Sequence, residues 1–196
     1  MPTDFALQAF HLNCFTCLQF FIVVCRHGAA MLSVSLQKVR AIADYQFGRC
    51  VGGELFPDGV EISFSKRTGR IRHVYYKGRL LVTLRPTDGL FSLTVEGGRR
   101  IMQTKPLKSW VKVQDDVADF IAEGRSVFAK HVVDCDEEIR PEEEVVVVDG
   151  HGEVLAVGRA VLTGKEMKAF EQGVAVRIRC GVSTKEGKVK KEKKGK

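Results

Sequence analysis

Two apolar runs divided by a glycine-containing turn constrain the fold of this chain more than any other feature. The first run is Val145–Val148, the turn is Asp149–Gly152 (Asp-Gly-His-Gly), and the second run is Leu155–Val161. Short apolar runs on either side of a turn are typical of β-strands, and aspartate and glycine tolerate the positive φ that tight turns require. The pattern predicts a strand, a tight turn and a second strand.

The residues after this pair of strands contain the signals of a short helix. Thr163 is a suitable N-cap and Glu166 follows three residues later, so the two are expected to form a capping box. Met167 and Phe170 fall on one face of the following turn, and Gly173 ends it. A third strand is expected to alternate, with one face made of Val174, Val176 and Ile178 and the other of Ala175, Arg177 and Arg179. Residues 139–179 therefore predict a small closed sheet with one covering helix.

Upstream, the sequence predicts a helix followed by a β-meander. Apolar residues keep a helical period across Leu36–Phe47, and Gly48, Gly52 and Gly53 interrupt it. Val60, Ile62 and Phe64 alternate with polar residues, as a half-buried strand does. Further strands are expected at residues 71–76, 80–84 and 90–95, with turns at residues 66–70, 77–78 and 87–89.

The segment between these two regions predicts a linker and then a short helix. Ile101–Trp110 contains Lys105-Pro106 and has no clear periodicity. Asp115 and Asp116 are expected to cap a short helix that ends at Gly124. One face of this helix is expected to carry Val117, Phe120 and Ile121, and Phe128 is expected in the core beyond it.

Charge is distributed unevenly along a chain whose net charge is +7. Residues 31–110 contain 14 basic and 6 acidic residues, a net +8, whereas residues 111–184 contain 9 basic and 15 acidic residues, a net −6. Residues 185–196 add 7 basic and 2 acidic residues. Clustered positive charge attracts polyanions because it releases their condensed counterions. The hydrophobic content of 44% fits a soluble globular protein of one or two small domains.

The basic residues of the middle segment are mostly arginines, whose planar guanidinium suits phosphates and stacked bases. We therefore favour RNA binding over simple surface solvation for this segment, and both explanations stay open for the lysine-rich tail. Tyr75 and Tyr76 lie among these arginines, as phosphate contact combined with base stacking requires. Because adjacent strand residues face opposite ways, one of the two tyrosines is expected to be buried. His73 is expected to have a structural role.

The first thirty residues allow three interpretations. The first is a secretory signal or a membrane anchor. Phe15–Cys25 is almost wholly apolar, but it is too short to span a bilayer, and a secretory signal would carry positive charge before it. Cys14-x-x-Cys17, with Cys25 and His27 beyond, is a weak zinc pattern because a second well-formed pair is missing. We prefer the third interpretation, that Met31 opens the native protein.

A search for catalytic residues yields no candidate. The acidic residues between Asp134 and Glu144 are expected to form a solvated rim, because nothing separates them into an acid and a base with different environments. The sequence has no glycine loop followed by lysine for phosphate binding and no helix with two metal-binding histidines. Cys50, Cys135 and Cys180 are isolated and do not require disulfides. We expect no catalytic residues, no metal and no cofactor.

Several segments resemble a known family. Ser126–Val133, Ile139–Pro141 and Leu155–Ala160 resemble a PUA domain, a small β-barrel attached to RNA-modifying enzymes, and are most similar to the C-terminal one of archaeal tRNA-guanine transglycosylase. That enzyme starts archaeosine synthesis. Arg40–Arg49, with two shorter runs at residues 66–72 and 84–89, resembles the patch-forming domain that precedes it there. The resemblance covers roughly Val39 to Gly181. The enzyme's catalytic barrel, with its nucleophilic aspartate and zinc cysteines, has no counterpart in this sequence.

The resemblance implies an α+β fold, in which a small α/β-meander domain precedes a PUA-type pseudo-barrel of mixed β-strands with short covering helices. The implied division is an N-terminal extension at residues 1–30, a patch-forming domain at 31–103 and a linker at 104–110. The PUA domain follows at residues 111–182, and a lysine-rich disordered tail at 183–196. In PUA domains a helix end and the next strand approach RNA, which here corresponds to the segment from Gly124 to Lys130. The residues expected to bind RNA are Arg40, Arg49, Arg70, Arg72, Tyr76, Arg85, Gly124, Arg125, Ser126, Lys130 and Arg177.

These expectations describe a cytoplasmic RNA-binding protein with no membrane contact. By resemblance the RNA is tRNA, bound at its acceptor arm, and the protein is a non-catalytic accessory to a separately encoded transglycosylase or another tRNA-modifying enzyme. One alternative is a general RNA- or ribosome-associated factor in translation, because a fold does not fix a function. The other is a small autonomous enzyme with an unrecognised site.

Overall fold

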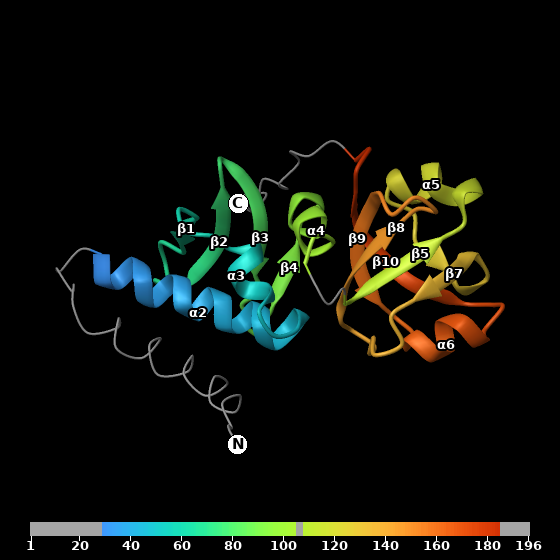
Figure 1. The fold of residues 1–196 in the computed structure, drawn as a ribbon, viewed down its shortest axis with the longest axis horizontal. Helices are drawn as coiled ribbons and strands as arrows, with labels where there is room; N and C mark the ends of the chain where they lie inside the picture. Colours follow the sequence, from blue (N-terminus) through green and yellow to red (C-terminus); the bar gives the residue numbers. More distant parts are fainter. Residues whose placement is uncertain (1–28, 105–107, 185–196) are drawn as a thin grey trace, which may run out of the picture. The chain divides into compact units, whose positions relative to one another are not determined.

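Alternating apolar and polar residues form two β-sheets in the computed structural model, which describes residues 29–104 and 108–184 (Figure 1). The first sheet is an antiparallel meander in the order β1-β2-β3-β4. Its strands are β1 (Glu61–Phe64), β2 (Ile71–Tyr76), β3 (Arg79–Leu84) and β4 (Phe91–Leu93). The helices of this half are α2 (Ala29–Phe47), α3 (Val51–Leu55) and α4 (Val95–Ile101). The predicted helix, meander and turns are confirmed.

The second sheet has six strands in the order β6-β10-β9-β8-β5-β7, with β5 parallel to β8 and every other pair antiparallel. Its strands are β5 (Trp110–Val113), β6 (Val127–Phe128), β7 (Val132–Cys135), β8 (Glu144–Val148), β9 (Val154–Ala160) and β10 (Val174–Gly181). The helices beside it are α5 (Ala118–Ala122) and α6 (Gly164–Ala169), with the 3-10 turns η1 (Asp115–Val117) and η2 (Ala129–His131). The sheet curls into a nearly closed pseudo-barrel, which confirms the predicted fold class.

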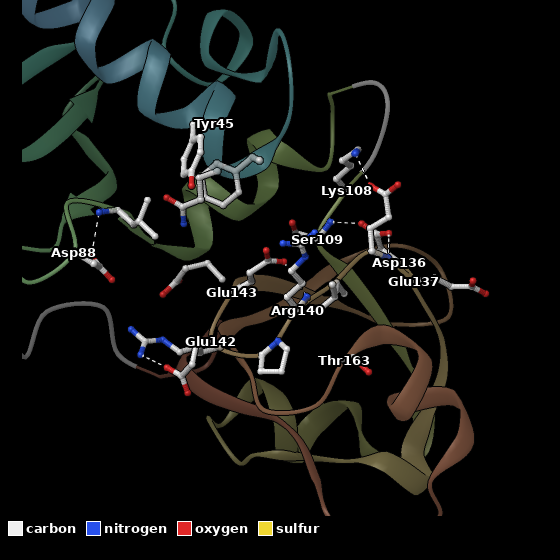
Figure 2. Close-up of a pocket in the computed structure, with 18 of the residues that line it drawn as sticks. Tyr45, Asp88, Lys108, Ser109, Asp136, Glu137, Arg140, Glu142, Glu143 and Thr163 are labelled. Atoms are coloured by element: carbon white, nitrogen blue, oxygen red, sulfur yellow. Dashed lines mark hydrogen bonds and ion pairs between the residues drawn. The ribbon is translucent and has the colours of Figure 1, made fainter.

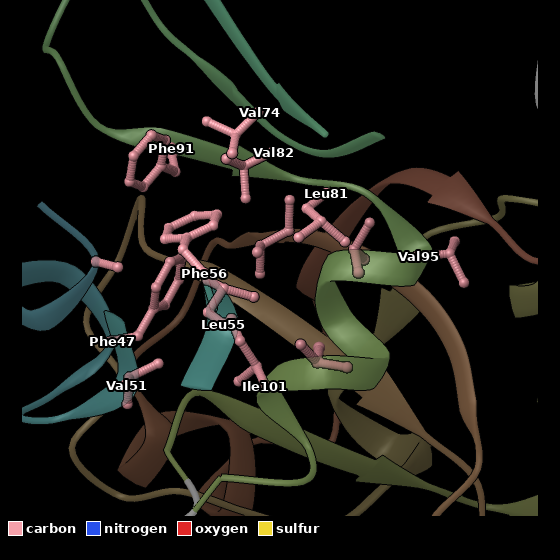
Figure 3. Packing of buried hydrophobic residues seen from close by; sticks show 14 of the residues in the cluster. Phe47, Val51, Leu55, Phe56, Val74, Leu81, Val82, Phe91, Val95 and Ile101 are labelled. Atoms are coloured by element: carbon pink, nitrogen blue, oxygen red, sulfur yellow. The ribbon is translucent and has the colours of Figure 1, made fainter. Parts of the chain in front are cut away.

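The four consecutive valines of β8 are buried on both faces of the strand. Val145 and Val147 lie in the interior of the barrel, whereas Val146 and Val148 belong to a second core that they share with the meander half. That shared core contains Phe47, Leu55, Phe56, Phe91 and Ile101 (Figure 3). Because successive residues of a strand point to opposite faces, an unbroken apolar run fits a strand that is covered on both sides.

Helix α4 closes the shared core and was not predicted. Thr94 caps it by accepting a hydrogen bond from the Gly97 backbone nitrogen at 3.2 Å, so the expected strand at residues 90–95 ends at Leu93. Gly97 and Gly98 weaken the helical signal in the sequence. Their small size has a packing reason, because a Cβ on Gly98 would lie 2.9 Å from Cγ1 of Val157. The helix thus packs directly against β9.

Several details of the meander half differ from the prediction. The first helix ends at Phe47, just before Gly48, as predicted, but Gly52 and Gly53 lie inside a second short helix, α3. Phe64 is half exposed because it ends the edge strand β1 at a register shift. Neither Tyr75 nor Tyr76 is fully buried, although Tyr76 packs against the shared core.

The barrel half also differs in its details. Asp115 does not cap a helix, because its carboxylate accepts from the Gly150 backbone nitrogen at 2.7 Å. Phe128 is exposed because its neighbour Val127 takes the inward face of β6. Phe120 is likewise exposed, while Ile121 turns into the core.

Near the C-terminal strand, the capping box of Thr163 and Glu166 is confirmed. Phe170 is exposed, because α6 ends at Ala169 and only Met167 of the pair turns inward. Gly173 therefore does not end the helix, and its carbonyl accepts from Ala129 at the start of η2. The simple alternation of β10 fails at Ala175 and Val176, which are both buried where the pairing register shifts.

The segment interpreted as a linker begins in a helix and ends in a strand, since Ile101 belongs to α4 and Trp110 to β5. Several predictions concern residues outside the described ranges. They are those for Lys105-Pro106, the N-terminal apolar run, the cysteine pattern and residues 185–196 of the tail. No helix within residues 29–104 and 108–184 has the length and apolar character to cross a membrane.

Candidate nucleic-acid interface

The two halves of the fold are joined by a buried carboxylate. Glu144 has a fully buried side chain, and its Oε2 accepts from the Leu93 backbone nitrogen at 3.2 Å. Nη1 of Arg179 donates to both carboxylate oxygens, at 2.6 Å and 2.9 Å, and Nη2 of Arg179 donates to the Leu93 carbonyl. The expectation that all acidic residues of this stretch form a solvated rim is therefore wrong for Glu144, because the guanidinium of Arg179 neutralises it.

Arg85 belongs to the same network and has little surface left for a ligand. Its side chain is 13% exposed, and its guanidinium pairs with Asp88 through contacts of 2.9 Å and 3.2 Å. Its Nη1 lies 3.6 Å from Glu144, which is too long for a hydrogen bond but close enough for electrostatic attraction. The prediction that Arg85 contacts RNA therefore has no support in this arrangement.

A wide groove lies between the end of α2 and the loop that leads into β8 (Figure 2). Its lining includes the acidic residues from Asp136 to Glu144 together with the cations Arg85, Lys108, Arg140, Arg159 and Lys165. Glu138 is paired there with Lys108 at 2.6 Å, and Asp136 accepts from the Ser109 backbone nitrogen at 2.9 Å. The exposed carboxylates of Glu137 and Glu138 repel phosphate at one end of the groove. That end is therefore a poor place for a nucleic-acid backbone.

Shifted pKa values do not mark an acid–base pair. The hydrogen bond from Lys168 lowers the pKa of Asp134, and burial raises the pKa of the Cys135 thiol. Burial, and then the charge of Arg72, lowers the pKa of His73, whose Nδ1 lies 3.1 Å from the Thr83 hydroxyl. Each shift follows from burial or an ion pair, and within the described residues no group of three or more metal-binding side chains occurs.

The predicted RNA-binding residues of the meander half fall into two groups. Arg49, Arg70 and Arg72 are exposed, and none forms an ion pair within the described residues, so they remain available to a ligand. Arg40 is engaged, because its Nε donates to the Phe56 carbonyl at 2.8 Å and its Nη2 contacts Asp58 at 2.9 Å. Arg40 therefore ties α2 to the segment before β1.

Tyr76 is half-buried beneath two cations. The guanidinium of Arg100 lies 4.7 Å from the ring centroid and the ammonium of Lys77 lies 5.3 Å from it. Arg100 also donates to the Leu55 and Glu54 carbonyls at the end of α3. Because one face of the ring is covered in this way, Tyr76 serves the packing of the meander more directly than base stacking.

Four predicted RNA-binding residues lie between Gly124 and Lys130. Gly124, Arg125 and Ser126 belong to the turn between α5 and β6, and Lys130 belongs to η2 beyond β6. Gly124 has a φ of 99°, a backbone conformation that favours glycine. Arg125 and Lys130 are exposed, and the Arg125 guanidinium lies 5.9 Å from the centre of the exposed Phe120 ring. The segment after β10 holds the end of α5 in place just before this turn, because the Ser183 backbone nitrogen donates to the Ala122 carbonyl at 3.0 Å.

Sequence reasoning missed three further residues. Phe120 of α5 and Phe128 of β6 are 54% and 47% exposed, so the elements on either side of the turn each carry an accessible aromatic ring. Arg159 of β9 is the direct strand partner of the predicted Arg177 of β10. The one sequence signal that could have identified Arg159 is the alternation along β9, which places it on the same face as Val157.

Comparison with known proteins was made for both halves. Residues 37–107 match the model of the patch-forming domain C2 of tRNA-guanine transglycosylase, and residues 109–182 match the model of the PUA domain. The chain is 43% identical over 147 residues to a tRNA-guanine(15) transglycosylase of Methanothermobacter thermautotrophicus, covering 74% of this chain and 22% of that protein. It is 44% identical over 145 residues to that of Thermococcus kodakarensis, covering 74% of this chain and 25% of the relative.

Two solved structures share the fold. A hypothetical protein of Pyrococcus horikoshii superposes with a TM-score of 0.62 at 23% identity, covering 78% of this chain and 92% of that one. A conserved PUA domain protein from Thermoplasma acidophilum superposes with a TM-score of 0.56 at 20% identity, covering 78% and 91%. The two family matches show that residues 37–107 belong to the family of the patch-forming domain C2 of tRNA-guanine transglycosylase, and that residues 109–182 belong to the PUA domain family.

Proposed function

We propose that the protein binds tRNA, and that the turn between α5 and β6 is a principal contact. The observation that carries the proposal is the combination of a left-handed glycine, Gly124, and the exposed Arg125 on this turn with the exposed Lys130 in η2 just beyond it. The family of both halves supports it, because relatives over 40% identical are named as tRNA-modifying enzymes. The acceptor arm is the part of tRNA that we infer to be bound.

The chemistry of this face suits structured RNA. An A-form duplex offers phosphates and 2′-hydroxyls rather than readable base edges in its deep groove. Arg125 and Lys130 provide charge for the phosphates, and Gly124 lets the backbone approach the ribose. Phe120 and Phe128 provide faces on which an unpaired base stacks. The exposed Arg70 and Arg72 of the meander half bind further phosphates.

Direct binding tests this proposal. Binding of the whole chain to total tRNA and to ribosomal RNA fragments is measured by gel shift and by filter binding across a range of salt concentrations. We expect tRNA to bind more tightly, and Arg125→Ala with Lys130→Ala to weaken that binding at each salt concentration. Tighter binding of the ribosomal fragments would support a translation-associated role instead, and absence of tRNA binding at low salt would contradict the proposal.

We also propose that the protein is a non-catalytic accessory that acts with a separately encoded transglycosylase or another tRNA-modifying enzyme in the cytoplasm. The chain spans about a quarter of the length of the curated relatives that it matches, and these are named for the whole enzyme. Addition of the protein to a catalytic partner is expected to lower the KM for tRNA. Base exchange by the isolated chain would contradict a purely accessory role.

A further inference from the structure

Two arginines face each other directly on the outer surface of the barrel half. Arg177 of β10 is the strand partner of Arg159 of β9 in the antiparallel register. Directly opposed side chains share a face and lie close together, and like charges in such a pair destabilise the sheet. Arg177 forms no ion pair within the described residues. The pair therefore presents a local excess of positive charge that an anion would neutralise.

A hollow of about 330 Å³ lies beside these arginines and includes residues of both halves of the fold. Ser92 of β4 lines it from the meander half, and the charged residues that line it are Glu142, Arg159, Arg177 and Arg179. A water molecule takes about 30 Å³ in the liquid, so the hollow has room for a hydrated phosphate group. Arg179 is held by Glu144, which neutralises it, and by the Leu93 carbonyl, so it forms a fixed wall of the hollow.

The position of the hollow follows from the packing of β9. Val157 points outward from the barrel into the core that it shares with the meander half. Arg159 is the next residue on that face, and its side chain is 39% exposed. The same face of the sheet thus changes from covered and apolar to open and basic within two residues.

Glu142 already occupies one side of the hollow as a counter-ion. Its Oε2 accepts from Nη1 of Arg159 at 2.6 Å, and its own side chain is 74% exposed. Its backbone is left-handed, with a φ of 70°, which is uncommon for a residue other than glycine. An exposed carboxylate of this kind exchanges readily with another anion, because water screens the pair.

We propose that this hollow binds one phosphate of the tRNA backbone between Arg159 and Arg177, with Glu142 as the counter-ion that the phosphate displaces. Guanidinium groups bind phosphate oxygens through paired hydrogen bonds. The strand that carries Arg177, β10, is the direct neighbour of β6 in the sheet, so the hollow and the proposed contact lie on adjacent strands. The inference rests on the proposed tRNA binding and adds a phosphate site at the junction of the two family domains.

The test compares tRNA binding across salt concentrations for the unmodified chain, Arg159→Gln, Arg177→Gln and the double variant. Because the two arginines share one phosphate, we expect the salt slope of the double variant to fall by about one unit and not by two. Glu142→Gln is expected to tighten binding several-fold, since the competing carboxylate is gone. Arg79→Gln is the matched control, because Arg79 is 70% exposed and paired with Glu96 away from the hollow.

The outcomes separate this inference from the proposed function. An unchanged slope in the double variant, or weaker binding by Glu142→Gln, overturns the phosphate site while tRNA binding by the unmodified chain stands. A fall of two units shows that each arginine binds its own phosphate and also overturns it. If the unmodified chain binds no tRNA, the proposed function fails. Circular dichroism of each variant establishes that the fold is intact.

Discussion

The guanidinium of Arg179 lies 2.6 Å from the carboxylate of Glu144, and both groups reach across to the Leu93 backbone of the other half of the fold. The charge pair thus comes from β10 and β8, the two barrel strands that flank β9, and its hydrogen bonds reach β4. The pair fixes where the meander half sits on the barrel half. It also explains why a glutamate starts a strand that is otherwise all valine.

Replacing the buried carboxylate should destabilise the protein. We expect Glu144→Gln to lower the free energy of unfolding by about 3 kcal/mol, since it leaves Arg85 and Arg179 without their shared counter-ion. The value is at the low end for a broken buried pair because Arg179 is 40% exposed. Urea unfolding measures it, with the exposed Glu153→Gln as control. Equal stability of the two variants would show that the carboxylate charge is unimportant.

Two helical glycines should respond in opposite directions to the same change. Gly98→Ala places a methyl group 2.9 Å from Cγ1 of Val157, so we expect the free energy of unfolding to fall by about 1–3 kcal/mol from overpacking. Gly53→Ala in α3 has no atom within 4 Å of the new Cβ, so we expect it to rise by about 0.5–1 kcal/mol. Thermal or urea unfolding distinguishes them. A rise for both would mean that α4 does not pack tightly on β9.

The exposed arginines of the meander half should contribute to tRNA binding. Arg70→Ala with Arg72→Ala is expected to weaken binding and to lower the salt slope by about one unit for each phosphate that the variant no longer neutralises. Filter binding at several salt concentrations measures the slope. An unchanged slope would mean that these side chains face solvent in the complex.

Acid should destabilise the meander through His73. Because burial lowers the pKa of His73 from its ordinary value of 6.5, the unfolded chain takes up a proton at higher pH than the folded chain. The contribution to stability is therefore complete above pH 6.5 and is lost as the pH falls from there through the lower pKa of the folded state. We expect the urea midpoint to drop less between pH 7.5 and pH 5.5 in His73→Gln than in the unmodified chain. An identical drop in both would assign the pH dependence to other groups.

Much of the fold could be predicted from local sequence signals. The capping box at Thr163 and Glu166, the meander turn at Lys77 and Gly78, and the apolar runs of β8 and β9 depend on residues within a few positions of one another. Local hydrogen bonds and side-chain alternation determine such features, so the printed order of residues is enough to find them. Arg70 and Arg72 were predicted as RNA ligands from the arginine-rich composition of their segment, and Arg125 and Lys130 from the family resemblance.

What the sequence alone determined is therefore the fold class, the family and the order of the strands along the chain. Only the tertiary structure decided which charges are buried: Glu144 looks like its neighbours Glu142 and Glu143, but its partners lie 35 and 51 positions away. The same holds for Arg85, which is engaged by Asp88 and Glu144, and for Phe120 and Phe128, which turn outward. Burial depends on which distant segment covers a side chain, and local pattern does not specify that segment.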